Sequence, residues 1–179
     1  MRVISGKYKG KKLIGFDING TRPTMDRVKE SLFSSIQSYI KDSIILDLFA
    51  GSGSLGIEAI SNGANCAYFV DNNIKLTNII KENTKDMSDK ITIIKDDYIN
   101  ALNNFKNKDI KFDIIFLDPP YKLNLINDCL NKIFKYELLN NNGIVVCEYE
   151  KEEVFTDKFR LMKQKKYGTK FISIYINDL

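Results

Sequence analysis

The chain has 179 residues, with 27 lysines and arginines against 23 acidic residues, a formal net charge of +4 and 44% hydrophobic residues. These values are ordinary for one globular domain with a proper core, and no apolar run approaches the length of a membrane span. The chain contains no histidine, which excludes histidine-based acid–base catalysis and histidine metal ligands. Its three cysteines lack a zinc-binding spacing, so we expect no metal and no disulfide. No signal-peptide segment opens the sequence, and we expect a cytoplasmic protein.

The first 40 residues predict a small extension that precedes the main fold. Residues 2–5 and 11–14 are expected to form a short hairpin around Gly6 and Gly10. A helix follows Arg22 and Pro23, and Thr24 is its expected N-cap. Its apolar face is expected to consist of Val28, Leu32, Ile36 and Ile40.

From residue 44 onward, strand patterns alternate with helix patterns. We expect strands at 44–49, 66–70, 91–95, 112–117 and 143–148, and helices at about 54–62, 73–86, 98–105 and 123–137. This alternation predicts an α/β fold with a mainly parallel sheet that helices cover on both faces. Residues 158–165 and 170–176 flank a Tyr-Gly-Thr turn and instead predict an antiparallel hairpin. We therefore expect one domain over 1–179, with an extension at 1–40 and a core at 41–179.

A glycine-rich loop follows the first strand of this core, in the sequence DLFAGSGSLG at 47–56. A strand, a glycine loop and a helix N-terminus form a nucleotide-type binding turn, although an ordinary flexible loop is the alternative. Asp47 would repel the pyrophosphate of a dinucleotide, whereas it would attract an ammonium group. The loop also lacks the GxxxxGK[ST] spacing of a phosphate-binding NTPase loop. The sequence therefore predicts S-adenosylmethionine (SAM) rather than NAD or ATP.

Acidic residues follow the next two strands as well. Asp71 lies 20 residues after Gly51, a distance at which an acidic side chain can accept both ribose hydroxyls of a nucleoside. The alternative is a helix N-cap, since a polar helical stretch begins directly after it. Asp96 and Asp97 end the third strand, and one of them is expected to accept a hydrogen bond from the adenine amine. A solvated turn is the alternative for this pair.

The sequence Asp118-Pro119-Pro120-Tyr121 follows the apolar run at 114–117. Because prolines fix φ and donate no N–H, the Asp118 carboxylate and the Pro119 carbonyl form a rigid pair of acceptors beside an aromatic ring. Such a pair suits a planar base that carries an exocyclic amine. The alternative is a strand end with a rigid turn and a core tyrosine.

Positive charge is concentrated near the two ends of the chain. Residues 1–12 and 158–170 hold 11 of the 27 basic residues and no acidic residue, so the remainder has a net charge of −7. This distribution predicts a surface that binds a polyanion, and the interleaved Tyr8 and Tyr167 could stack on bases. The alternative is a pair of solvated edge strands that lysines protect from aggregation.

These motifs together resemble the RsmD-type 16S rRNA guanine-N2 methyltransferases of bacteria over nearly the whole chain. The matching segments are RVISGKYKGKKL at 2–13, TRPTMDRVKESLF at 21–33, LDLFAGSGSLGIEA at 46–59, FVD at 69–71 and FLDPPY at 116–121. Two departures stand out: Lys29 replaces an expected arginine, and Thr169-Lys170 replaces a more usual Asp-Thr pair. The resemblance implies a seven-stranded class I SAM-dependent methyltransferase sheet with an antiparallel last strand. It also implies SAM as cofactor and 16S rRNA as substrate, within an assembled small ribosomal subunit, for a monomeric enzyme.

With this resemblance we predict three sets of site residues. The catalytic set is Asp118, Pro119, Pro120 and Tyr121. The cofactor-binding set is Asp47, Phe49, Gly51, Gly53, Asp71, Asn72, Asp97 and Tyr98. The substrate-binding set is Arg2, Lys7, Lys9, Arg22, Thr24, Lys122, Lys166 and Tyr167. The alternative functions are an adenine-N6 methyltransferase acting on RNA or DNA, and a non-catalytic RNA-binding module with a SAM-type fold.

Overall fold

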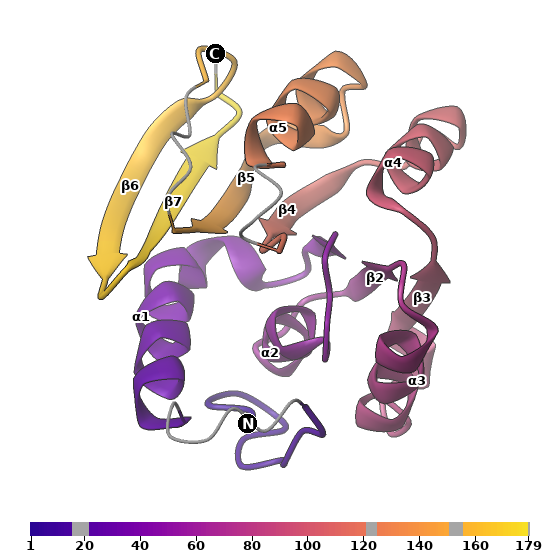
Figure 1. Ribbon diagram of the computed structural model, residues 1–179, viewed down its shortest axis with the longest axis vertical. Coiled ribbons are helices and arrows are strands. Elements are labelled where there is room, and N and C mark those ends of the chain that lie inside the picture. Colours follow the sequence, from indigo (N-terminus) through magenta and orange to yellow (C-terminus); the bar gives the residue numbers. More distant parts are fainter. Residues whose placement is uncertain (16–21, 121–124, 151–155, 179) are drawn as a thin grey trace.

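The computed structural model describes residues 1–15, 22–120, 125–150 and 156–178 (Figure 1). Its centre is a seven-stranded sheet with the strand order β3-β2-β1-β4-β5-β7-β6. The strands are β1 (Ile44–Asp47), β2 (Cys66–Asp71), β3 (Ile91–Lys95), β4 (Phe112–Leu117), β5 (Leu139–Tyr149), β6 (Arg160–Tyr167) and β7 (Lys170–Ile176). The helices are α1 (Arg22–Ile40), α2 (Ser54–Ser61), α3 (Ile74–Asn83), α4 (Tyr98–Asn107) and α5 (Ile126–Lys135), with a short 3-10 helix η1 (Ser88–Lys90).

The first five strands are parallel, and β7 is antiparallel to both of its neighbours, β5 and β6. The last strand turns back because the two-residue connection at Gly168, where φ is +62°, closes a tight hairpin after β6. The predicted fold class, including the antiparallel last strand, is confirmed.

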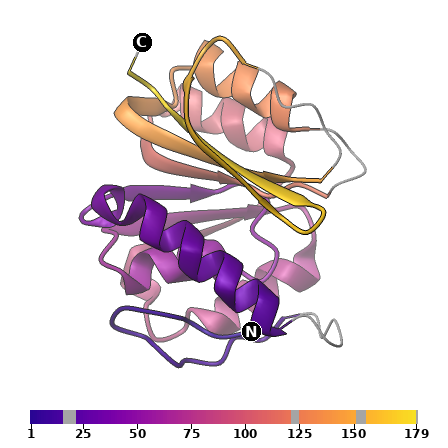
Figure 2. The same cartoon turned by 90° about the vertical axis from the view of Figure 1, so that its left-hand side faces the viewer.

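Alternate residues of the central strands face two separate hydrophobic cores. Ile45, Ile114 and Ile144 are buried with side chains of α1, α2 and α3. Their chain neighbours, Leu46, Ile115 and Val145, are buried with side chains of α4 and α5. The helices therefore cover both faces of the sheet, and Figure 2 shows α1 on one side of the strands and α5 on the other.

The long helix α1 packs the predicted apolar face against the sheet, with Leu32, Ile36 and Ile40 buried and Val28 partly buried. The prediction of Thr24 as its N-cap is wrong, because the helix begins two residues earlier, at Arg22. Pro23 lies in the first turn, where its missing N–H has no helical acceptor to lose.

Several other predicted boundaries differ from the structure by one to four residues, for example the helix predicted at 73–86, which spans Ile74–Asn83. The first core strand ends at Asp47 rather than at residue 49, because the glycine loop begins there. The fifth strand begins at Leu139, four residues before the predicted start, and its register with β4 shifts between Phe112 and Ile114. Asn142 has a φ of +61° in this irregular stretch, a conformation that the strand pattern does not predict.

The N-terminal segment is hairpin-like, as predicted, but it forms a single antiparallel bridge, between Arg2 and Lys12. It docks on the C-terminal end of α2, where the Lys7 N–H donates to the Ser61 carbonyl at 2.7 Å. Gly6 is required here, because a Cβ at this position would lie 1.9 Å from the Ser61 carbonyl oxygen. Across the residues that the structure describes, no helix is both long enough and apolar enough to cross a membrane.

Candidate functional site

The candidate site lies at the carboxyl edge of the parallel strands. Asp47 pairs in register with Phe69 of β2 and with Phe116 of β4, so β1, β2 and β4 end side by side. The helices change from one face of the sheet to the other between β1 and β4, since α2 and α3 cover one face and α4 and α5 cover the other. Ligands of open α/β sheets bind in the crevice at such a point.

The glycine loop turns sharply at this edge, with φ values of +56° at Gly51 and +81° at Gly53. A Cβ on Gly51 would meet open space, whereas one on Gly53 would lie 3.2 Å from the Phe69 ring. Gly51 thus borders the space where a ligand can approach the backbone, and Gly53 allows the loop to pack against β2. Gly53 is the N-cap of α2 and supplies no side-chain cap, so the N–H groups in the first turn of α2 depend on acceptors from elsewhere in the chain or from a ligand.

Asp47 lies beneath this loop and is only 2% exposed. Its Oδ2 accepts a hydrogen bond from the Gly56 N–H at 3.1 Å, which joins the end of β1 to α2. Burial raises the pKa of Asp47 to about 7, the Gly56 hydrogen bond opposes this shift, and the nearby Asp71 adds to it. Asp47 therefore holds the loop, and its contact with a cofactor ammonium stays a prediction.

Asp71 faces the same loop from β2. Its Oδ2 accepts from the Gly51 N–H at 3.0 Å and its Oδ1 from the Asn73 N–H at 2.9 Å. The N-cap of α3 is Asn73, whose side chain accepts from the Lys75 N–H. Asn73, rather than Asp71, is thus the N-cap of α3. Asn72, also predicted to bind cofactor, is exposed beside Asp71.

The carboxylates predicted to bind adenine, Asp96 and Asp97, make hydrogen bonds within the protein. Asp97 is the N-cap of α4, where its Oδ1 accepts from the Asn100 N–H at 2.9 Å. Asp96 accepts from the Asp97 N–H through Oδ1. Both side chains therefore stabilise the turn after β3, and the contact of one of them with adenine stays a prediction.

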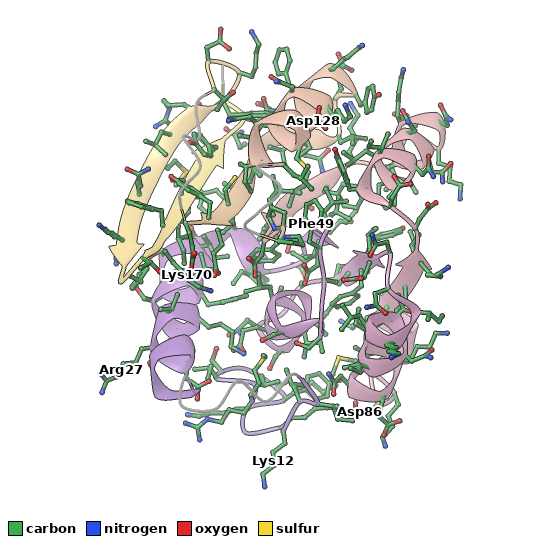
Figure 3. All side chains as sticks on the ribbon, in the orientation of Figure 1. Lys12, Arg27, Phe49, Asp86, Asp128 and Lys170 are labelled. Carbon is green, nitrogen blue, oxygen red and sulfur yellow. The ribbon has the colours of Figure 1, made fainter. Side chains whose placement is uncertain are left out.

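An aromatic pair lies between the glycine loop and α4. The rings of Phe49 and Tyr98 are 5.7 Å apart at 42°, and Figure 3 shows Phe49 near the centre of the molecule. The Tyr98 hydroxyl donates to Asp128 Oδ2 at 2.9 Å, which anchors the ring to α5. Burial and this carboxylate raise the pKa of Tyr98 to about 12, so the phenol stays neutral. Each ring is a flat apolar face of the kind that a planar base can pack against.

The predicted catalytic segment directly follows β4. Asp118 is partly buried, Pro119 is buried and Pro120 is exposed. Burial raises the pKa of Asp118 well above its ordinary value. Glu148 and Asp47 raise it further, whereas Lys170 lowers it.

Some predicted residues lie outside the described part of the structure. These are Tyr121 and Lys122, together with the side chains of Arg22 and Thr24, whose backbones open α1.

The described substrate-binding candidates divide into free and engaged side chains. Lys7 lies over the Tyr8 ring, 5.1 Å from its centroid, and Lys9 is exposed. Arg2 pairs with Asp26 at 3.2 Å. In Figure 3, Lys12 and Arg27 project outward from the N-terminal segment and α1.

The C-terminal hairpin is tied to α1 more firmly than its lysine content suggests. The Tyr167 hydroxyl donates to Ser31 Oγ at 2.7 Å, and the ring packs against the core. Lys163 and Lys165 donate to Ser35 and Ser31. Lys166 lies over the Phe171 ring at 5.3 Å from its centroid.

Sequence reasoning missed a buried ion pair between Lys29 and Glu58. Lys29 Nζ lies 3.0 Å from Glu58 Oε2, and their side chains are 8% and 0% exposed. Glu58 also accepts from the N–H groups of Ile4 and Ser5, while Lys29 donates to the Arg2 carbonyl at 2.7 Å. The pair joins the N-terminal segment, α1 and α2. The one signal was the lysine at a position where the family pattern leads us to expect arginine.

The sheet order, the glycine loop and the site at its carboxyl edge define a class I SAM-dependent methyltransferase. The RNA methyltransferase of Salinibacter ruber, solved in complex with S-adenosyl-L-homocysteine, shares this fold with a TM-score of 0.64 at 13% identity, over 85% of this chain and 91% of that one. The solved structure of yhhF from Escherichia coli matches with a TM-score of 0.87 at 27% identity, over 99% of this chain and 98% of that one.

Sequence relatives narrow the class to a family. The chain is 37% identical to YlbH of Bacillus subtilis over 98% of both chains. It is 34% identical to Ribosomal RNA small subunit methyltransferase D of Haemophilus influenzae over 99% of this chain and 94% of that one. The family model described as Conserved hypothetical protein 95 matches residues 1–176, and the chain belongs to this family. The predicted resemblance to the RsmD-type proteins is thereby confirmed.

Proposed function

We propose that the protein transfers the methyl group of SAM to the exocyclic N2 amine of a guanine in 16S rRNA. The observation that carries the proposal is the position of Asp118 and Pro119, beside the glycine loop at the switch point of the sheet. Two acceptors at this place suit the two N–H groups of an amine. Relatives named as rRNA small subunit methyltransferases support an rRNA substrate. We also propose that the protein is a cytoplasmic monomer and that it acts on assembled small ribosomal subunits.

The residues present fit SAM. Gly51 borders open space, and Asp71 is held by the N–H groups of Gly51 and Asn73. The rings of Phe49 and Tyr98 offer apolar aromatic faces. Asp71 would accept the ribose hydroxyls, and the aromatic pair would lie against the adenine. Bound SAM supplies an electrophilic methyl group on a positively charged sulfur.

The chain's own residues would orient the amine. The lone pair of a guanine N2 is delocalised into the ring, which makes this nitrogen a poor nucleophile. The ionised Asp118 and the Pro119 carbonyl accept its two N–H groups and favour a pyramidal nitrogen whose lone pair points at the methyl group. Tyr121 would stack on the extruded base. Asp118 need not act as a strong base, because the amine becomes acidic only after methylation.

The test is product analysis. Small-subunit particles and free 16S rRNA are incubated separately with the protein and isotope-labelled SAM, and the digested RNA is analysed by mass spectrometry. We expect labelled N2-methylguanosine, with the particles as the better substrate. Labelled N6-methyladenosine would contradict the proposal in favour of an adenine enzyme. Absence of any product, with SAM bound, would indicate a non-catalytic RNA-binding module.

A further inference from the structure

Glu148 and Lys170 lie beside Asp118, although no catalytic motif contains them. Leu117 of β4 pairs with Cys147 of β5 in a parallel register, so Asp118 and Glu148 follow at adjacent strand ends. Because β7 runs antiparallel to β5, Lys170 at the start of β7 reaches the same edge. Figure 3 shows Lys170 near the tip of the β6–β7 hairpin.

Glu148 and Lys170 form a close ion pair, with 2.6 Å between Lys170 Nζ and Glu148 Oε1. Their side chains are 16% and 35% exposed, so solvent screens the pair only in part. Burial is the largest single effect on the pKa of Lys170 and lowers it, but the charge and hydrogen bond of Glu148, together with the charges of Asp118 and Glu150, raise this pKa overall. The lysine is therefore charged at neutral pH.

The charges around Asp118 come from three strands. Asp47 of β1 and Glu148 of β5 are like charges that oppose ionisation of Asp118, and burial opposes it most strongly. Lys170 of β7 is the cation that opposes them within the described part of the chain. The pKa of Asp118 is raised overall, so Lys170 compensates only part of these effects.

We propose that Lys170 and Glu148 are positioning residues for methyl transfer: Glu148 holds the Lys170 ammonium where its charge favours the ionised form of the Asp118 carboxyl. The inference rests on the proposed function, in which the ionised Asp118 accepts an N–H of the target amine. A protonated carboxyl would present an O–H to the amine and would lose an acceptor. The pair thus sets the lowest pH at which the site can bind the amine productively.

The activity test compares pH profiles of single-turnover methylation at saturating SAM. Lys170→Met leaves Glu148 and Asp118 as unopposed like charges, so the acidic limb should move up by about one pH unit or more. Glu148→Gln removes the like charge, so the limb should move down. The double variant should lie between the two, and Lys170→Arg should restore the wild-type limb. Lys85→Met removes an exposed lysine that follows α3 and should leave the limb unchanged.

A second readout needs no substrate. In ¹³C-carboxyl-labelled protein, the Asp118 signal is assigned by its loss in Asp118→Asn and is then titrated by NMR. Lys170→Met should raise the Asp118 midpoint and Glu148→Gln should lower it. An unchanged midpoint in both variants would overturn the inference, even if the wild type methylates guanine. An equal loss of activity at every pH, with an unchanged midpoint, would mean that the pair is only structural. If the wild type gives no guanine product, the proposed function fails, and the NMR titration still decides whether the pair controls Asp118.

Discussion

The two halves of the site hold their carboxylates in different ways. At the ends of β1 and β2, Asp47 and Asp71 accept hydrogen bonds from backbone N–H groups of Gly56 and Gly51. At the end of β4, Asp118 lies in a cluster of side-chain charges that β5 and β7 contribute. The cofactor half is thus organised within one βαβ unit. The amine-binding half depends on residues that only the complete sheet brings together.

Lys29 and Glu58 form a buried ion pair that joins segments distant in sequence, so breaking this pair should have the largest effect on stability. Lys29→Met leaves the fully buried Glu58 without its cation and should reduce the free energy of unfolding by about 3–5 kcal/mol. Urea denaturation measures this change. Lys85→Met breaks the exposed pair with Glu82, which solvent screens, and should change the free energy of unfolding very little. Equal losses in the two variants would mean that Glu58 is stabilised by its backbone donors alone.

The amine-binding half should carry the chemistry. Asp118→Ala removes one of two acceptors at the reacting nitrogen and should slow single-turnover methylation of small-subunit particles by about 10²–10³-fold. Asp89→Ala, an exposed change in η1, should leave the rate unchanged. Thermal melting shows whether each variant is folded. Near-normal turnover by folded Asp118→Ala would remove Asp118 from the mechanism.

The cofactor half should instead control SAM affinity. Asp71→Ala removes the proposed ribose acceptor and the acceptor of the Gly51 N–H, so SAM binding should weaken by about 1–3 kcal/mol. Asp71→Asn retains an oxygen for the loop and should have a smaller effect. Isothermal calorimetry measures both, and an unchanged affinity of Asp71→Ala would place the ribose elsewhere.

Replacing single lysines of the basic surface should have the smallest effect on function. Replacing Lys7, Lys9 and Lys166 by glutamine should lower the salt dependence of RNA binding by about 2–3 in the log–log slope, while SAM affinity stays the same. The control replaces Lys81, Lys85 and Lys108, which are also exposed and lie on or after α3 and α4. Equal slopes for the two triple variants would show that total charge, rather than a defined surface, attracts RNA.

The same comparison explains what the sequence could predict. The glycine loop and the strand-end aspartates follow local rules, since Asp47, Gly51 and Asp71 lie within one βαβ unit, a motif with a recurring geometry. The positions of the helices and the antiparallel β6–β7 hairpin also follow from local sequence patterns. Thr24 was misplaced because capping patterns do not fix the exact first turn of a helix.

The rest depends on contacts between distant residues. Lys29 meets Glu58 across 29 positions, and Glu148 meets Lys170 across 22. No periodicity indicates such pairs before the fold is known. The sequence likewise shows that the C-terminal hairpin is rich in lysine. It does not show that Lys163 and Lys165 donate hydrogen bonds to serines of α1.

The most direct test of the central claim measures both properties in the same two variants. Asp118→Ala and Asp71→Ala are compared for SAM affinity by calorimetry and for single-turnover methylation at saturating SAM. The division of the site predicts that Asp118→Ala binds SAM normally and loses turnover, whereas Asp71→Ala binds SAM weakly and recovers most of its turnover at saturation. Equal defects of both variants in both measurements would contradict it.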